Sequence, residues 1–202
     1  ALECCQTAFQ IAEEYKDSNC SLLATTYNNI GHIEEKQGKL DSALENYARS
    51  IEIYTKCFGE DDIHLAGPYS NMGSIYLNKN MLDEAHKYFQ KALLIRLNDL
   101  QQGSPEVALE YNNIGTVFQS QGENDRALYY HYKALEILLN CYGEEHPLVA
   151  SSYLNIGSIY QSQGKIDEAR AYFKKTFEIK EKVLGADHPE TIVARFCLEL
   201  FK

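Results

Sequence analysis

The sequence predicts an all-α repeat protein whose helical repeats stack into a solenoid. The first observation is the segment Tyr111-Asn112-Asn113-Ile114-Gly115, because versions of it recur with the same internal spacing. The tyrosines of its four versions are each 42 residues apart: Tyr27, Tyr69, Tyr111 and Tyr153. The second observation is the helical spacing of apolar residues around each version, as at Leu23, Tyr27, Ile30 and Ile33. A period between 20 and 50 residues indicates stacked repeats rather than one compact core.

We number each 42-residue repeat so that its tyrosine is position 4. Position 8 is then glycine and position 20 is alanine in all four repeats. Position 24 is large and position 27 is small: Tyr47, Phe89, His131 and Phe173, and Ser50, Ala92, Ala134 and Thr176. This pattern resembles the tetratricopeptide repeat, a helix-turn-helix repeat of about 34 residues. The additional residues, with elements such as Leu184-Gly185-Ala186-Asp187-His188-Pro189, resemble the repeats of kinesin light chain.

The resemblance implies a right-handed α-solenoid of antiparallel helix pairs, with about ten helices and no cofactor. We expect one repeat domain over residues 1–202. Its expected parts are the second helix of a truncated repeat at 1–20, repeats at 21–62, 63–104, 105–146 and 147–188, and the first helix of a truncated repeat at 189–202. Because the end helices lack their partners, we also expect possible self-association through these truncated ends.

Composition narrows the class of protein and of partner. Apolar residues make up 45% and charged residues 24% of the chain, as in a globular protein. The formal net charge of −10 disfavours nucleic acid and anionic membranes as partners, because both attract basic surfaces. No apolar run approaches the roughly 18 residues of a membrane span, and no basic-then-apolar leader opens the sequence. We therefore expect a cytoplasmic protein without membrane insertion.

The six cysteines lack the Cys-x-x-Cys spacing of metal sites. Cys57 and Cys141 occupy the same repeat position, and we interpret them as small buried apolar residues rather than as redox or metal-binding groups.

Local signals place the helices in order. Residues 1–17 match the second helix of a repeat, and a first helix is expected from Ser21 to about Lys36. Gly38 should end that helix, since a tight reversal needs a residue with positive φ, and the same slot holds Gly122, Gly164 and Asn80. The paired helix should run from Leu40 to about Cys57.

Prolines mark the later helix starts. Gly67-Pro68 should make the next first helix begin late, near Ala66, or kink there. Pro105 and Pro147 follow Ser104 and His146 in an order typical of an N-cap and the first helical residue. His146 and His188 are therefore interpreted as caps rather than as metal ligands.

The glycines at position 8 need a compensating contact, because glycine inside a helix costs roughly 0.5–1 kcal/mol relative to alanine. We expect close approach of the paired helix near the small alanine at position 20. His131, at a large core position, is interpreted as an interior or boundary histidine whose hydrogen bonds are satisfied. No Ser/His/Asp, Cys/His or paired-carboxylate pattern converges by spacing, so we expect no enzyme activity.

The remaining surface is the one that first helices line in tetratricopeptide arrays, through positions near 2, 5, 6, 9, 12 and 13. The resemblance implies that this surface is a concave groove that binds a peptide segment of a partner protein. The candidate peptide-binding residues are Asn28, Asn29, His32, Asn71, Ser74, Asn112, Asn113, Thr116, Gln119, Asn155 and Ser158. Position 6 is asparagine in all four repeats, and its amide offers both donors and an acceptor to a peptide main chain. The alternative is that asparagine is merely tolerated on an exposed helix face.

Charge distinguishes this groove from others in the family. Members that bind a terminal carboxylate carry Lys or Arg where this sequence has Leu109 and Asn113. The sequence therefore predicts a nearly neutral, amide-lined groove in a non-catalytic protein-interaction scaffold. Two alternatives stay open: a sensory or autoregulatory repeat domain that controls an attached effector, and an architectural array within a larger assembly.

Overall fold

The computed structural model describes residues 20–100 and 102–200, and every regular element in these two ranges is a helix. The expected helix at residues 1–17 lies outside the described residues. The chain divides into two compact units between Leu100 and Gln101. None of the described helices is long and apolar enough to cross a lipid bilayer.

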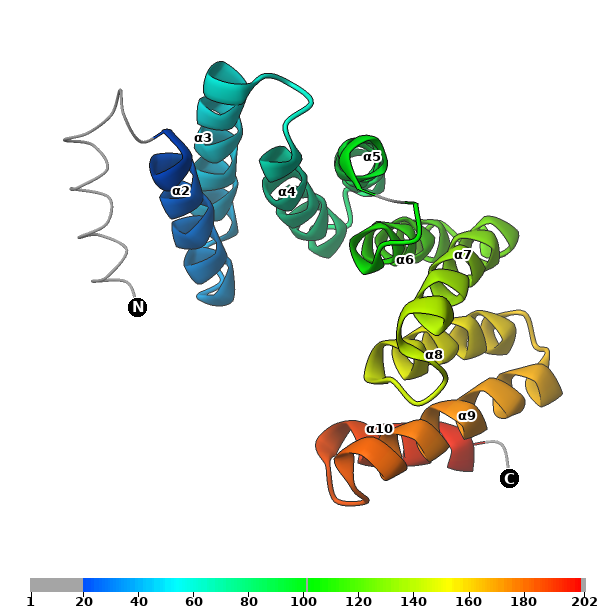
Figure 1. Ribbon diagram of the computed structural model, residues 1–202. Helices are drawn as coiled ribbons and strands as arrows, with labels where there is room; N and C mark the ends of the chain where they lie inside the picture. The colour runs from blue at the N-terminus through cyan, green and yellow to red at the C-terminus, as the bar shows by residue number, and fades with distance from the viewer. Residues whose placement is uncertain (1–19, 101, 201–202) are drawn as a thin grey trace. The chain divides into compact units, whose positions relative to one another are not determined.

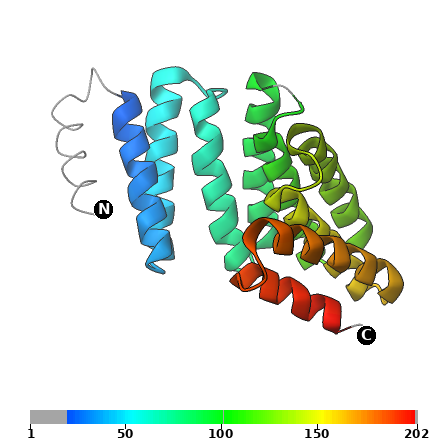
Figure 2. The same cartoon turned by 60° about the horizontal axis from the view of Figure 1, so that its bottom comes forward.

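Each unit is built from antiparallel helix pairs (Figure 1). In the N-terminal unit, α2 packs on α3 and α4 packs on α5. The C-terminal unit pairs α6 with α7 and α8 with α9, and α10 packs on α9; Figure 2 shows the members of each pair side by side. The bounds are α2 Cys20–Lys36, α3 Leu40–Phe58, the short 3₁₀ helix η1 Ile63–Leu65, α4 Ala66–Asn78, α5 Leu82–Asp99, α6 Pro105–Ser120, α7 Asn124–Tyr142, α8 Pro147–Ser162, α9 Ile166–Leu184 and α10 Pro189–Glu199.

The turns within the pairs follow the prediction. Gly38 has a φ of 77°, and the N–H groups of Gly38 and Lys39 donate to the carbonyl oxygens of Glu35 and Glu34, at 2.9 Å each. This is the Schellman arrangement, in which a left-handed residue closes the last helical turn. Asn80, with a φ of 57°, is the only non-glycine residue with positive φ in the described part of the chain. It occupies the same slot, as expected for the residue that best tolerates this conformation after glycine.

The helix starts also agree with the predicted caps. Ser104 Oγ accepts a hydrogen bond from the N–H of Val107, and Nδ1 of His146 accepts one from Leu148 at 3.2 Å. His188 caps α10 in the same way, through the N–H of Glu190. Helix α4 begins at Ala66, after η1, so the late start predicted from Gly67-Pro68 is confirmed.

The position-8 glycines are closely packed, and their nearest neighbours are ring atoms at position 24 rather than the alanine at position 20. A Cβ atom at Gly73 would lie 2.7 Å from two ring carbons of Phe89, and one at Gly157 would lie 2.8 Å from the ring of Phe173. The space that the glycine leaves is therefore filled by the fully or almost fully buried ring at position 24. At Gly31 the carbonyl oxygen of the position-20 alanine, Ala43, also lies close, at 3.1 Å. The paired helix therefore approaches closely, and the ring at position 24 is its nearest group.

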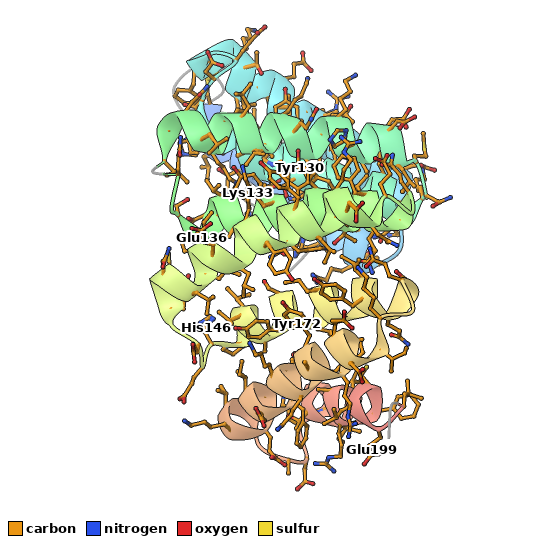
Figure 3. The ribbon with its side chains drawn as sticks, turned by 90° about the vertical axis from the view of Figure 1, so that its right-hand side faces the viewer. Tyr130, Lys133, Glu136, His146, Tyr172 and Glu199 are labelled. Atoms are coloured by element: carbon orange, nitrogen blue, oxygen red, sulfur yellow. A yellow bond between two sulfur atoms is a disulfide. The ribbon has the colours of Figure 1, made fainter. Side chains whose placement is uncertain are left out.

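A second aromatic contact recurs between positions 11 and 23 of the pairs. The ring pairs are Tyr76–Tyr88, Phe118–Tyr130 and Tyr160–Tyr172, with centroids 5.2, 5.4 and 5.6 Å apart. In Figure 3, Tyr130 and Tyr172 mark this position on α7 and α9. The first repeat replaces the rings by polar groups: the carboxylate of Glu34 accepts hydrogen bonds from Ser42 at 2.8 Å and Asn46 at 2.7 Å.

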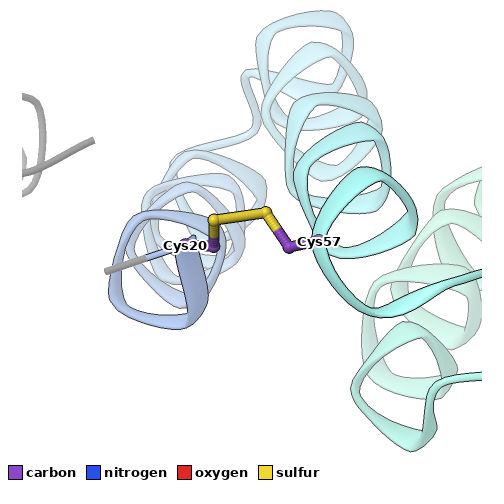
Figure 4. The surroundings of a disulfide bond; sticks show 2 residues. All are labelled: Cys20 and Cys57. Atoms are coloured by element: carbon purple, nitrogen blue, oxygen red, sulfur yellow. A yellow bond between two sulfur atoms is a disulfide. The ribbon is translucent and has the colours of Figure 1, made fainter. Parts of the chain in front are cut away.

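Two cysteine expectations are overturned. Cys57 forms a disulfide with Cys20, which ties the end of α3 to the start of α2 (Figure 4). Cys141 is exposed rather than buried, and its thiol donates to the carbonyl oxygen of Gly103 at 3.1 Å. The register explains the difference: Cys20 lies at the position that Ser104 holds two repeats later, so Cys141 faces no cysteine partner in that repeat.

Candidate protein-interaction surface

The candidate residues lie on the first helices of the pairs, and each of them is at least partly exposed to solvent. We call the side chains at positions 2, 5, 6 and 9 of α2, α4, α6 and α8 the first-helix strip. Within each unit, its two first helices contact one another, α2 with α4 and α6 with α8. Asn29 and His32 are exposed, and the other nine candidates are half-buried. Gln119 lies at position 12, one turn beyond the strip near the end of α6.

In the N-terminal unit the strip carries an amide contact between neighbouring repeats. Asn71 on α4 donates through Nδ2 to Oδ1 of Asn28 on α2, at 3.2 Å. Each amide can form further hydrogen bonds, because a carboxamide offers two donors and two acceptor sites. Asn29 projects into solvent beside them. This part of the strip is thus a polar surface with hydrogen-bonding capacity in excess of its internal contacts.

In the C-terminal unit one candidate proves to have a packing role. Asn112 Oδ1 lies 2.9 Å from Nδ1 of His131 on α7, and its Nδ2 donates to Ser152 on α8 at 3.4 Å. Asn112 therefore connects three helices through both ends of its amide. Its neighbour Asn113 donates to Glu110 at 3.2 Å and remains half-buried.

His131 is a buried histidine that is satisfied at only one nitrogen within the described residues. Its Nδ1 faces Asn112, whereas its Nε2 is buried without a hydrogen-bond partner there. Burial lowers the pKa of His131 to about 4, because the charged form loses hydration. The expectation of a fully hydrogen-bonded interior histidine was thus correct for one side of the ring.

Position 9 of the strip offers mainly hydrogen-bond acceptors to a bound peptide. The hydroxyls of Ser74, Thr116 and Ser158 donate to the carbonyl oxygens four residues earlier, at 3.2, 3.0 and 2.9 Å. Their protons are used within the helix, and their lone pairs remain available to a donor on a ligand. The exposed His32 occupies this position on α2, with Nδ1 3.8 Å from Glu35.

The strip is also free of charge in the C-terminal unit. On α6 and α8 it consists of Leu109, Asn112, Asn113 and Thr116, and of Ser151, Leu154, Asn155 and Ser158. Leu109 is 50% exposed. Leu109 and Leu154 were not among the candidates, although their positions 2 and 5 could have identified them. The surface can therefore form hydrogen bonds and apolar contacts, but it offers no ion pair.

Two hollows lined by a tyrosine and a lysine lie outside the strip, and the sequence did not indicate them. Tyr153 and Lys175 line a cavity of about 300 Å³ together with Glu144, and Tyr69 and Lys91 line one of about 250 Å³ together with Glu60. In each, the lysine Nζ lies about 5 Å from the ring centre, at 5.0 and 4.9 Å. Burial, with a smaller contribution from the nearby glutamate, raises the pKa of both tyrosines. No strip residue lines either cavity.

Comparisons with known proteins agree with this architecture. The family model described as the tetratricopeptide repeat matches residues 1–56, 22–98, 106–182 and 148–196. The chain is similar in structure to BtubC (BKLC) from P. vanneervenii, with 23% identity and a TM-score of 0.83 over 98% of this chain and 78% of that chain.

The chain is also similar to a putative kinesin light chain from Podosopora anserina with nearly identical TPR-like repeats. That structure has 17% identity and a TM-score of 0.72, over 86% of this chain and 82% of that one. A variant of the same protein has 16% identity and a TM-score of 0.75, over 90% and 85%. No curated protein matches the chain. The chain belongs to the tetratricopeptide repeat family.

Proposed function

We propose that the chain is a non-catalytic interaction scaffold that binds a peptide segment of a partner protein along its first-helix strip. The tetratricopeptide fold is in general a scaffold for protein–protein interaction. The observation that carries the finer proposal is the recurrence of asparagine at position 6, as Asn29, Asn71, Asn113 and Asn155. Within each unit these side chains are half-buried or exposed on the first helices, where a peptide main chain can reach them.

The composition of the strip supports a particular kind of recognition. Hydrogen bonds between neutral groups contribute about 0.5–1.5 kcal/mol each. They are weakly screened by salt, whereas a basic clamp on an acidic peptide loses affinity as salt rises. The proposal therefore includes weak salt dependence of binding. The net charge of −10 supports a protein partner over nucleic acid.

Binding can be tested with peptides selected from a displayed library of random 12-residue sequences. The variant Asn113→Ala with Asn155→Ala removes both position-6 amides of the strip in the C-terminal unit. It should weaken the selected peptide roughly 5- to 150-fold, for a loss of about 1–3 kcal/mol in total, as measured by calorimetry. The matched control is Asn98→Ala, an exposed amide on the second helix α5. Equal binding by the double variant and the parent would show that the peptide does not bind to the strip.

We also propose a cytoplasmic location, and the disulfide provides its test. Disulfides are rare in the reducing cytosol and persist in oxidising compartments. Cys20 and Cys57 should therefore be labelled as free thiols when cells are lysed under thiol-trapping conditions. Recovery of the two cysteines as a disulfide would contradict this location.

A further inference from the structure

An exposed apolar stripe runs along α10 in the C-terminal unit. Val193, Phe196 and Leu200 are 55%, 62% and 56% exposed. They are spaced by three and four residues, so they share one face of the helix. Such exposure of three large apolar side chains on one face indicates a surface that contacts something else.

The register of the stripe identifies the surface to which it belongs. Val193, Phe196 and Leu200 stand one period after Ser151, Leu154 and Ser158, at positions 2, 5 and 9. On α8 these positions remain only half-buried although α9 packs along the helix. The stripe therefore continues the first-helix strip, and a helix paired with α10 as α9 is with α8 would leave these positions partly exposed.

The face that a paired helix does cover is different on α10. Positions 4 and 8 are Tyr153 and Gly157 on α8, and both are buried under the pair. On α10 they are Arg195 and Glu199; Glu199 is exposed at the end of the helix (Figure 3). The exposed apolar residues of this segment are thus concentrated on the strip side, apart from Ile192 at position 1.

Helix α10 is held firmly by its opposite side. Thr191 Oγ1 donates to the carbonyl oxygen of Lys180 at 3.2 Å, and Ala194 is buried against α9. Lys180 Nζ donates to the carboxylate of Glu190 at 2.9 Å, and this contact lowers the pKa of Glu190. These contacts fix the rotation of α10 and keep the stripe facing outward.

We propose that the stripe is an apolar subsite at the α10 end of the strip, and that it takes aliphatic or aromatic side chains of the bound peptide. The inference rests on the proposed function. The strip changes character along the C-terminal unit: position 6 is Asn113 and Asn155 on α6 and α8, but Cys197 on α10. The fitting partner is an uncharged peptide segment with a cluster of apolar residues at one end, because the strip on α6 and α8 carries no charged side chain.

The test uses the displayed 12-residue library, panned on the whole chain. Selected peptides should carry two or more clustered apolar residues, and the variant Phe196→Ser should weaken their binding at least tenfold. Leu200→Ser serves as a second variant in case Phe196→Ser lowers the melting temperature. The matched control is Val183→Ser, which removes a 44% exposed apolar side chain of α9 outside the strip.

The outcomes separate this inference from the proposed function. Binding that is weakened by Asn155→Ala but not by Phe196→Ser or Leu200→Ser would support the strip as the peptide-binding site and would overturn the apolar subsite. Binding that responds to none of these variants would overturn both. A parent dimer in analytical ultracentrifugation that Phe196→Ser converts to monomer would make the stripe a self-association face and would also overturn the subsite.

Discussion

Substitution of Gly73 by alanine tests the packing between glycine and ring that repeats through the fold. The new Cβ would lie 2.7 Å from Cδ1 and Cε1 of Phe89 and 3.0 Å from Cγ. Carbon atoms in contact normally lie about 3.5–4.0 Å apart, so the buried ring must move by several tenths of an ångström. Overpacking of this kind costs about 1–3 kcal/mol, whereas exchange of glycine for alanine inside a helix gains about 1 kcal/mol. We expect a net loss of about 1 kcal/mol in the free energy of unfolding.

The same helix provides the control. A Cβ atom added at Gly67, near the start of α4, would meet no atom within 4 Å, so Gly67→Ala should stabilise by about 0.5–1 kcal/mol. The difference between the two variants isolates the overpacking energy. It should disappear when Gly73→Ala is combined with Phe89→Leu, since leucine lacks the ring edge.

Urea denaturation followed by circular dichroism measures the free energies of unfolding of the parent, the two glycine variants, Phe89→Leu and the double variant. Each kcal/mol corresponds to roughly 2–4 °C in melting temperature for a chain of this size. The reasoning would be refuted if Gly73→Ala stabilised the parent as much as Gly67→Ala does. It would equally fail if the loss persisted unchanged in the Phe89→Leu background, because the ring would then not be the opposing group.

The remaining predictions concern protonation and thiol chemistry. Because the pKa of His131 falls from its usual 6.5 to about 4 on folding, its contribution to stability is complete above pH 6.5 and decreases as pH falls to 4, by up to about 3 kcal/mol. His131→Phe should remove this part of the pH dependence, measured by urea unfolding at both pH values, and an unchanged pH profile would contradict the assignment. Opening the Cys20–Cys57 bond by Cys57→Ser should cost up to about 4 kcal/mol, since the bond closes a loop with a separation of 37 residues, and Cys141→Ser should cost little. Ser104→Cys should form a second disulfide with Cys141, detected by mass spectrometry under non-reducing conditions; two free thiols after mild oxidation would show that the register does not transfer between repeats.

Features set by local chemistry could be predicted from the sequence. The reversal at Gly38 and Asn80 depends on one residue's tolerance of positive φ, and the N-caps at Ser104 and His146 depend on neighbours within three residues. Such signals are complete within a short stretch of chain. They therefore placed the bounds of α2 and α3 and the start of α4 to within about one residue.

Features that depend on side-chain register between helices could not be predicted. Both the glycine contact and the disulfide join residues on different helices, and a repeat pattern does not say which atoms face each other. Asn112 shows the same limit at the candidate site, because a residue that resembles its neighbour Asn113 in the pattern turns its amide toward His131. For α10 the sequence predicts only that the helix lacks a partner. The exposure of the equivalent positions on α8 is needed to show which side chains stay accessible when a partner helix packs.

Some helix pairs carry polar side chains where the other repeats have aromatic ones, and this difference affects how the similar repeats assemble. A first helix can in principle pair with the second helix of another repeat, or of another molecule by domain swapping. The carboxylate of Glu34 on α2 accepts hydrogen bonds from Ser42 and Asn46 on α3. If α2 paired with α5 instead, Glu34 would face Glu84 and Tyr88 at the equivalent positions and would lose both hydrogen bonds. Paired with α4 or α8, His131 would face Ser70 or Leu154 in place of the amide of Asn112. These side chains thus favour pairing of each first helix with the second helix of its own repeat. The repeats share one backbone fold, but their helices are not interchangeable.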